Sequence, residues 1–194
     1  MDRETELTLV AGLRDGDAAA FDTVHDAFHT RLFTFLLRLC RRRDVAEDLV
    51  EETWLRLVKH ARRLRPDTRL AAWLFTVARR VHVSYVRSRV LEDSAAVGLI
   101  ALWPSAVARA SPFEAAAASE LERRIERALA SIPLSSREVL LLVAAAGLDH
   151  TDAAAVLGVT PEALRQRLSR ARASLARAIE KTPAGARVLR EVLP

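Results

Sequence analysis

The segment Asp149–Arg172, DHTDAAAVLGVTPEALRQRLSRAR, restricts the fold of this chain more than any other stretch. It predicts a short helix over Thr151–Leu157, with Asp149 as its expected N-cap. Gly158 can take the positive φ of a sharp turn. A second helix then begins with Thr160 as its cap and Pro161 at its first position. The segment therefore predicts a helix-turn-helix.

The second helix of this motif separates its apolar side chains from its basic ones. At about 100° per residue, one face carries Leu164, Leu168, Ala171, Leu175 and Ile179. The opposite side and its flanks carry Arg165, Gln166, Arg167, Ser169, Arg170 and Arg172. Arginine can pair with guanine and glutamine with adenine in a major groove, and further arginines can neutralise phosphates. We expect a DNA-recognition helix, with an ordinary solvated helix as the alternative.

The aromatic residues divide the chain into two parts. Eight of the ten lie before residue 90, and none lies after Phe113. Glycine is scarce, with six residues, which favours helix over strand. We expect an all-α protein of two small helical domains joined by a linker, the second containing the helix-turn-helix. The expected ranges are a first domain at 1–90, a linker at 91–118, a second domain at 119–181 and a tail at 182–194.

Apolar spacing of three and four residues predicts the remaining helices. Their expected ranges are 4–14, 18–40, 45–64 and 68–90 in the first half, and 115–131 and 135–146 in the second. Asp67 or Thr68 is expected to cap the helix over 68–90, and SSRE predicts a capping box between Ser135 and Glu138. The helix over 45–64 is expected to bury a stripe that includes Trp54 and Val58.

Bulk properties limit the class of protein. The net charge of +5 and the pI near 10.5 favour a polyanionic partner. The N-terminus lacks a signal-peptide pattern and the longest apolar run is too short for a membrane span, so no membrane insertion is expected. A single cysteine, Cys40, excludes an intrachain disulfide and favours the reducing cytoplasm.

No constellation of residues predicts catalysis. The sequence lacks a nucleophile–base set, a glycine-rich phosphate loop and zinc-ligand spacing. His25 and His29 stand four residues apart, as a metal pair could, but no third ligand is near them in sequence. We expect no catalytic residue, no metal and no cofactor.

Charge is distributed unevenly in the first half. Asp44, Glu47, Asp48, Glu51 and Glu52 form an acidic cluster within nine residues. Basic residues then alternate with Trp73, Phe75 and Tyr85. This mixture suits single-stranded nucleic acid, because bases stack on aromatic rings while cations neutralise the backbone. The alternative is that Trp73 and Tyr85 belong to the core and that the acidic stripe is a solvated face.

Two motifs, DVAEDLVEETWLRLVKHARRLRPDTRLAAWLFTVARR and LASIPLSSREVLLL followed by LGVTPEALRQRLSRARASL, closely resemble bacterial extracytoplasmic-function (ECF) sigma factors, the two-domain specificity subunits of RNA polymerase. The resemblance covers roughly Glu6 to Ile179. It implies a non-enzymatic promoter-specificity subunit that binds the core polymerase at the clamp of its largest subunit and the flap of its second-largest subunit. It also implies that the subunit helps to open the promoter.

The resemblance implies a role for particular residues. It implies that Asp48, Glu51 and Glu52 bind the polymerase. It implies that the melted minus-ten element is captured by the RLRPDTR loop, with Arg63, Arg65, Asp67 and Arg69, and by Arg79, Arg80, His82 and Arg87. The minus-thirty-five duplex would be read by the six polar residues of the recognition helix given above.

Some features depart from the family pattern. Arg80 stands where the family often has asparagine, and both the LLLVAAAGL helix and the VGLIALWPSAVA linker are unusually apolar. Together these apolar segments lead us to expect an inhibitory partner, an anti-sigma protein. Two alternatives remain open, a stand-alone helix-turn-helix regulator and a helical protein-interaction adaptor.

Overall fold

The computed structural model describes residues 1–96 and 120–180, and side chains within 1–90 and 123–180. The chain divides into two compact units, one N-terminal and one C-terminal. Every regular element in the described ranges is helical. The predicted all-α class with two helical domains is therefore confirmed. None of the described helices combines the length and apolar character that crossing a bilayer requires.

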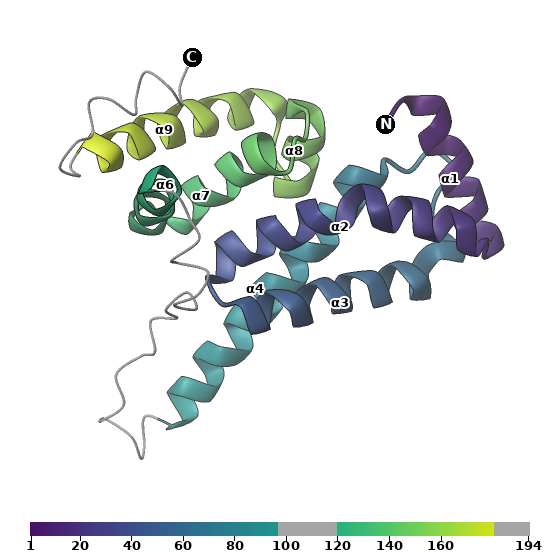
Figure 1. Cartoon of the computed structure of the whole chain (residues 1–194), viewed down its shortest axis with the longest axis horizontal. Helices are drawn as coiled ribbons and strands as arrows, with labels where there is room; N and C mark the ends of the chain where they lie inside the picture. The colour runs from purple at the N-terminus through teal and green to yellow at the C-terminus, as the bar shows by residue number, and fades with distance from the viewer. Residues whose placement is uncertain (97–119, 181–194) are drawn as a thin grey trace. The chain divides into compact units, whose positions relative to one another are not determined.

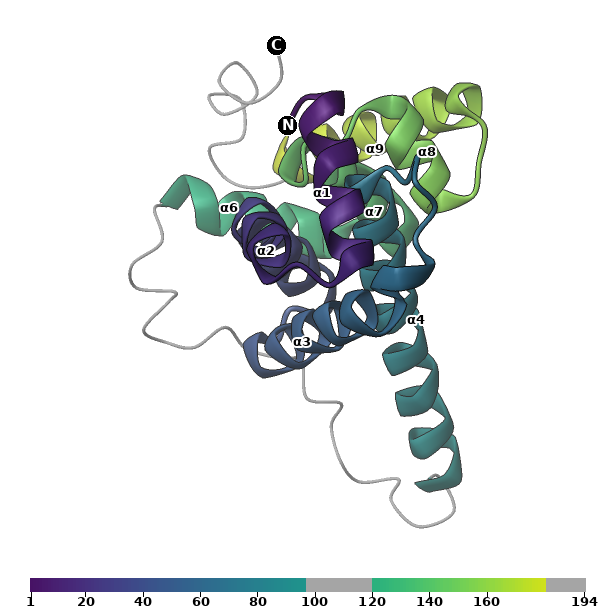
Figure 2. The same ribbon diagram turned by 90° about the vertical axis from the view of Figure 1, so that its right-hand side faces the viewer.

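The first unit is built from four α-helices and one turn of 3-10 helix (Figure 1). These are α1 (Arg3–Asp15), α2 (Ala18–Cys40), α3 (Arg43–His60), η1 (Ala61–Arg63) and α4 (Leu70–Ala96). Helix α2 packs side by side with α3, α4 crosses both, and α1 packs on α2 and η1. The C-terminal part of α4 extends beyond the other helices of this unit (Figures 1 and 2).

The core of the first unit lies between α2, α3 and α4. The rings of Phe35 and Phe75 meet edge to face, with centroids 5.3 Å apart. The apolar spacing of α2 and α3 predicted most of these buried residues correctly. Val58 is an exception, because its side chain is 59% exposed. Trp73 is only partly buried and so is not a full core residue.

Helix boundaries in the first unit follow local capping chemistry. The carboxylates of Asp2 and Asp17 accept hydrogen bonds from the amides of Thr5 and Ala19, both at 2.9 Å. Gly16 ends α1 with φ at 83°. The bounds of α2 are those expected. Helix α3 begins and ends earlier than expected, and its last predicted turn is the 3-10 turn η1.

The prediction for the start of α4 was wrong. The helix begins at Leu70, and the buried amide of Leu70 donates to the carboxylate of Glu6 at 2.8 Å. Asp67 instead accepts from Arg65. The acceptor comes from α1, which no local pattern around residue 68 could reveal. At its other end α4 continues to Ala96, so six residues of the expected linker are helical.

The second unit places its last helix across the others (Figure 1). Its elements are α6 (Glu120–Ser131), α7 (Leu134–Leu140), the π-helical turn η2 (Leu141–Ala145), α8 (His150–Leu157) and α9 (Pro161–Glu180). Helix α9 packs on α6, α7 and α8. The part of the expected helix before residue 120 lies outside the described residues.

The predicted helix-turn-helix is confirmed in its details. The carboxylate of Asp149 accepts from the amide of Asp152 at 2.7 Å, which caps α8. Gly158 has a φ of 65° at the turn. The hydroxyl of Thr160 accepts from the amide of Ala163 at 3.2 Å. Pro161 occupies the first position of α9.

The predicted capping box at Ser135 was wrong. Helix α7 starts at Leu134, and the carbonyl of Pro133 accepts the first helical hydrogen bonds, from the amides of Ser136 and Arg137. Ser135 therefore lies inside the first turn, while Glu138 is buried at 6% exposure.

The unusually apolar helix is also explained by packing. Its large side chains Leu140, Leu141, Leu142 and Leu148 are buried, only Val143 being partly exposed, and α7 packs on α9 within the same unit. Since this apolar surface serves the core of the second unit, it no longer supports an inhibitory partner. The apolar part of the expected linker lies outside the described residues.

Candidate nucleic-acid interface and acidic face

The outward side of α9 carries a continuous polar surface. This recognition face consists of Arg165, Gln166, Arg167, Ser169, Arg170 and Arg172, all of which are exposed. The opposite face is buried, with Leu164 and Ala171 at 0% and Leu168 at 4% exposure. The amphipathic reading of this helix is therefore confirmed, and the role of its polar face in DNA binding stays a prediction.

Two arginines of the recognition face, Arg165 and Arg170, are only loosely held. Arg165 Nη2 lies 3.3 Å from the Glu162 carboxylate, in an exposed pair one helical turn away. Arg170 Nε donates a long hydrogen bond of 3.4 Å to the carbonyl of Gln166. Exposed pairs of this kind contribute about 0–1 kcal/mol. Both guanidinium groups can therefore turn to an incoming anion or base edge at little cost.

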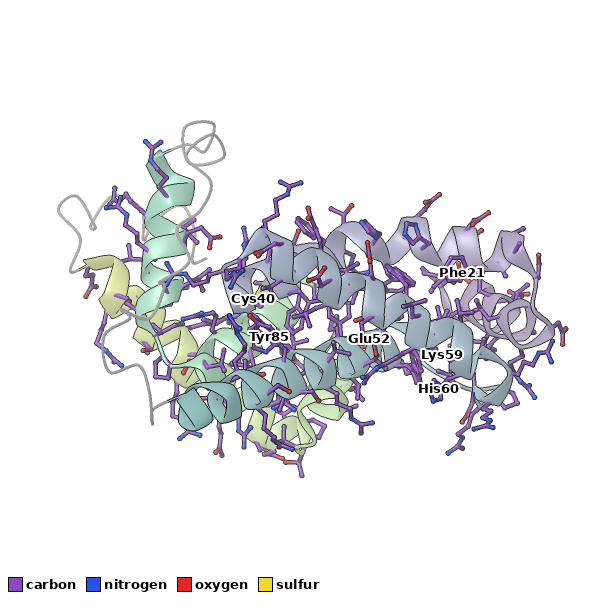
Figure 3. The ribbon with its side chains drawn as sticks, turned by 90° about the horizontal axis from the view of Figure 1, so that it is seen from below. Phe21, Cys40, Glu52, Lys59, His60 and Tyr85 are labelled. Carbon is purple, nitrogen blue, oxygen red and sulfur yellow. The ribbon has the colours of Figure 1, made fainter. Side chains whose placement is uncertain are left out.

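The N-terminal half of α3 presents an acidic face made of Asp48, Glu51 and Glu52. Asp48 and Glu51 are exposed, and Glu52 is partly exposed (labelled in Figure 3). Glu52 pairs with Arg56 at 2.7 Å. Within the described ranges, neither Asp48 nor Glu51 forms an ion pair. Both carboxylates therefore remain available to a cationic partner.

A groove of about 680 Å³ opens beside the acidic face, between α2 and α3. It is lined by Phe21, His25, His29, Phe33, Arg43, Glu47, Val50, Glu51, Trp54, Leu55 and Val58. At its floor Trp54 Nε1 donates to His29 Nδ1 at 3.3 Å, and the rings of His25 and His29 lie 4.6 Å apart. The described residues contain no group of three metal-ligating side chains, so the two histidines lack a third ligand.

Sequence reasoning missed this groove. Leu55 and Val58 expose 51% and 59% of their surface at its edge, next to Glu51. The sequence pattern assigned Val58 to the buried stripe because it follows Trp54 by four residues. The one available signal was Leu55, an apolar residue on the polar side of α3. The acidic face is therefore bordered by exposed apolar surface, a combination typical of protein interaction sites.

The loop between η1 and α4 displays the predicted polar residues. Arg63, Arg65, Asp67 and Arg69 are all exposed. The amide of Thr68 donates to the carbonyl of Arg65 at 3.0 Å, which closes a turn around Pro66. Buried Leu64, at 5% exposure, anchors the start of the loop. The structure thus gathers the loop residues at one exposed turn.

Helix α4 presents some, but not all, of its predicted contacts. Arg80 and Arg87 are exposed, and Arg79 is partly buried. His82 is only 2% exposed, so its ring cannot reach a bound strand in this conformation. The reason is periodicity, since His82 follows Ala78 by four residues and Leu74 by eight on the buried side. We remove His82 from the candidate interface.

Two aromatic side chains of α4 remain accessible. Trp73 and Tyr85 are each partly exposed (Tyr85 is labelled in Figure 3), and the guanidinium of Arg89 lies 6.0 Å from the centre of the Tyr85 ring. Neither ring belongs wholly to the core. Partly exposed rings of this kind, one of them with an arginine beside it, can accept stacked bases.

Comparison with known protein families matches both units. The sigma-70 region 2 family matches residues 24–92, and the sigma-70 region 4 family matches residues 122–175. The ECF RNA polymerase sigma factor EcfG of Rhodopseudomonas palustris is 33% identical over 169 residues, covering 87% of this chain and 86% of the relative. The RNA polymerase sigma factor CarQ of Myxococcus xanthus is 29% identical over 160 residues, covering 81% of this chain and 87% of the relative.

Solved structures share the fold. CnrH, in complex with the cytosolic domain of CnrY, matches with a TM-score of 0.72 at 23% identity, over 92% of this chain and 99% of that one. The sigma factor RpoE of Bartonella quintana, in complex with the anti-sigma factor NepR, matches with a TM-score of 0.64 at 28% identity. The match covers 81% of this chain and 92% of RpoE.

Proposed function

The chain belongs to the extracytoplasmic-function family of RNA polymerase sigma factors, and we propose that it directs the core polymerase to promoters by binding two separated DNA elements and helping to open the duplex. In this proposal residues 1–90 bind the polymerase and the minus-ten element, and residues 119–181 bind the minus-thirty-five element. Residues 91–118 connect them, and 182–194 form a tail.

One observation carries the proposal. A single chain presents an exposed recognition face on a helix-turn-helix. A separate unit carries the loop of residues 63–69, called the basic loop below, together with accessible aromatic rings and an acidic face. A stand-alone helix-turn-helix regulator needs only the first of these. An adaptor protein needs neither the recognition helix nor the aromatic-basic surface. The combination is what a subunit requires when it must bind duplex DNA, unpaired DNA and a protein together.

The recognition face of α9 suits duplex DNA. A major groove admits a helix and displays a distinct pattern of donors and acceptors for each base pair. Arg165 and Arg170 are long enough to reach base edges, and Gln166 can pair with adenine. Arg167 and Arg172, on the flanks, suit contacts with phosphates.

The basic loop and α4 suit an unpaired strand. Extracting a base from the stack costs a few kcal/mol, about the strength of a few good contacts. Arg63, Arg65 and Arg69 can neutralise the backbone, and Asp67 offers a carboxylate to a base. Along α4, Arg80 and Arg87 lie on the exposed side, and Trp73 and Tyr85 offer ring faces for stacking.

The acidic face and its groove suit a basic, amphipathic partner. We assign Asp48, Glu51 and Glu52 to the clamp of the largest polymerase subunit, with Leu55 and Val58 adding apolar contact. The second unit would lie on the flap of the second-largest subunit. The chemistry of RNA synthesis belongs to the polymerase, so this subunit acts without catalytic residues of its own and works in the cytoplasm.

We also propose that an anti-sigma protein holds this chain inactive. The support is the likeness to the sigma factor RpoE, which is 28% identical to this chain. The structure of RpoE was solved in complex with an anti-sigma factor. The acidic face and the groove beside it are exposed and therefore accessible to such a partner.

The deciding experiment is in-vitro transcription with core polymerase and a pool of genomic promoters, with and without the purified chain. We expect new start sites only when the chain is present, together with formation of a chain–core complex. DNA binding by the chain alone without any effect on initiation would favour the stand-alone regulator. Absence of salt-dependent DNA binding in every setting would favour the adaptor.

A further inference from the structure

Glu6 of α1 is a buried carboxylate with no place in the interfaces described above. It is 8% exposed, and it contacts a part of the chain far from it in sequence. Its Oε1 accepts a hydrogen bond from the amide of Leu70 at 2.8 Å, across 64 residues. Its Oε2 lies 2.5 Å from Nη1 of Arg3. Both oxygens therefore have a partner, as a buried carboxylate requires.

Arg3 extends this contact to the backbone of the basic loop. Its Nη2 donates to the carbonyl of Asp67 at 2.9 Å, and its Nη1 lies 3.4 Å from the carbonyl of Thr68. One guanidinium thus connects the Glu6 carboxylate with two successive carbonyls of the turn. Only the backbone of the turn is engaged. The side chains of Arg65, Asp67 and Arg69 stay exposed.

The physical effect of these contacts is to order the loop before a ligand arrives. Glu6 satisfies an amide in the first turn of α4 and places negative charge at the positive end of that helix. Hydrogen bonds that involve charged groups are about twice as strong as neutral ones. A turn held at Asp67, Thr68 and Leu70 loses less conformational freedom on binding than a free loop does, which raises its affinity.

We propose that Arg3 and Glu6 are positioning residues, which hold the 63–69 loop in the shape that captures an unpaired promoter base. The inference rests on the proposed function of that loop. It extends the DNA-binding apparatus to α1, an element that touches no DNA in this scheme. Helix α1 would thereby influence how strongly, and how selectively, the minus-ten element is held.

The test uses the full chain bound to core polymerase. The DNA probe is a duplex that carries an unpaired non-template tail with randomised bases, so that binding and base preference are read together. The variants are Arg3→Met, which keeps the aliphatic stem but loses the donors, and Glu6→Gln, which keeps one acceptor but loses the charge. Glu4→Gln is the matched control, because Glu4 is exposed on the same helix and loses the same charge.

We expect Arg3→Met and Glu6→Gln to weaken binding of the unpaired tail by about three- to tenfold, the cost of ordering one or two side chains, and to flatten its base preference. Affinity for core polymerase and for a duplex upstream element should stay unchanged, and Glu4→Gln should match the parent chain. Unaltered tail binding and base preference in both variants would overturn the inference.

Two further outcomes separate the possible failures. A parallel loss of core binding, upstream binding and thermal stability would mean that the two residues only support the fold, which also overturns the inference. If the parent chain with core polymerase binds no unpaired tail at all, the proposed function of the loop fails, and the positioning role fails with it.

Discussion

The Nε of Arg137, on α7, donates a hydrogen bond to the carbonyl oxygen of Leu129, on α6, over 2.8 Å. The Nη2 of the same guanidinium lies 3.0 Å from the carbonyl of Ala130 and 3.4 Å from that of Ile132. The last carbonyls of α6 have no partners within their own helix, and a cation at that end also complements the helix dipole. One buried arginine thus joins α6 and α7, two of the three helices on which α9 packs.

Replacing this arginine should destabilise the second unit. We expect Arg137→Lys to lower the free energy of unfolding by about 2–4 kcal/mol. The planar guanidinium donates to three carbonyls, whereas the compact ammonium group of lysine cannot reach all three and leaves buried acceptors without a hydrogen bond. Urea unfolding followed by far-ultraviolet circular dichroism measures the change. Arg127→Lys, at an exposed position of α6, should shift it by less than about 0.5 kcal/mol. Equal effects of the two substitutions would contradict the buried contact.

Gly12 allows α1 and α2 to approach closely. A Cβ added at Gly12 would lie 2.7 Å from the Cβ of Ala20, closer than two such atoms can stand. We expect Gly12→Ala to destabilise the first unit by about 1–3 kcal/mol, although alanine is the better helix former. The second substitution Ala20→Gly should restore part of the loss by removing the opposing Cβ. Thermal unfolding of the single and double variants tests this, and a stabilised Gly12→Ala protein would refute it.

The recognition face should control selectivity for the upstream element. We expect Arg165→Ala and Arg170→Ala to relax discrimination between base pairs at the contacted positions by about 1–3 kcal/mol. Arg177→Ala, exposed further along the same helix, should weaken binding uniformly or leave it unchanged. Sequencing the promoters that each holoenzyme selects from a randomised pool gives the comparison. An unchanged preference in the first two variants would remove these residues from the reading face.

The acidic face should be required for polymerase binding. Reversing charge with Asp48→Lys and Glu51→Lys places cations where a basic partner is expected, and like charges across an interface cost several kcal/mol. We expect the double variant to fold normally and to lose co-purification with core polymerase. Asp22→Lys, at an exposed site of α2, is the control and should retain it. Retained binding by the double variant would locate the interface elsewhere.

Cys40 should be a slow nucleophile in the folded protein. Burial raises the pKa of its thiol, and the thiol donates to the carbonyl of Arg42 at 3.2 Å, at the end of α2 (Figure 3). Because the thiolate is the reactive form, a raised pKa leaves less of it at pH 8 than in the unfolded chain. Alkylation by iodoacetamide should therefore be slower in buffer than in urea. A native rate equal to that of a free thiol would contradict this environment.

The raised pKa of Cys40 also has a definite effect on stability. The pKa of this thiol is higher in the folded chain than in the unfolded chain. Its contribution to the stability of the folded state is therefore fully present at a pH below the unfolded pKa, and it is lost as the pH rises through the folded pKa. Comparison of the parent chain with Cys40→Ser across alkaline pH isolates that contribution.

Several features were readable from the sequence because they depend on residues close together in the chain. Helical hydrogen bonds join residues four apart, and apolar side chains at that spacing fall on one face. The bounds of α2, the caps at Asp149 and Thr160, the turn at Gly158 and the two faces of α9 follow from this local chemistry. The resemblance to a family rests on the same short stretches.

Other features were decided by the tertiary structure. A residue to which the resemblance gave a role in DNA binding can be buried, as His82 is. One on the predicted apolar stripe can be exposed, as Val58 is, because burial depends on which neighbouring helix covers each side. The groove beside the acidic face exists only where α2 and α3 meet. The contact of Glu6 with Leu70 joins positions 64 residues apart. Local periodicity determines which segments become helices, but the desolvation of each side chain depends on partners that only the folded chain brings near.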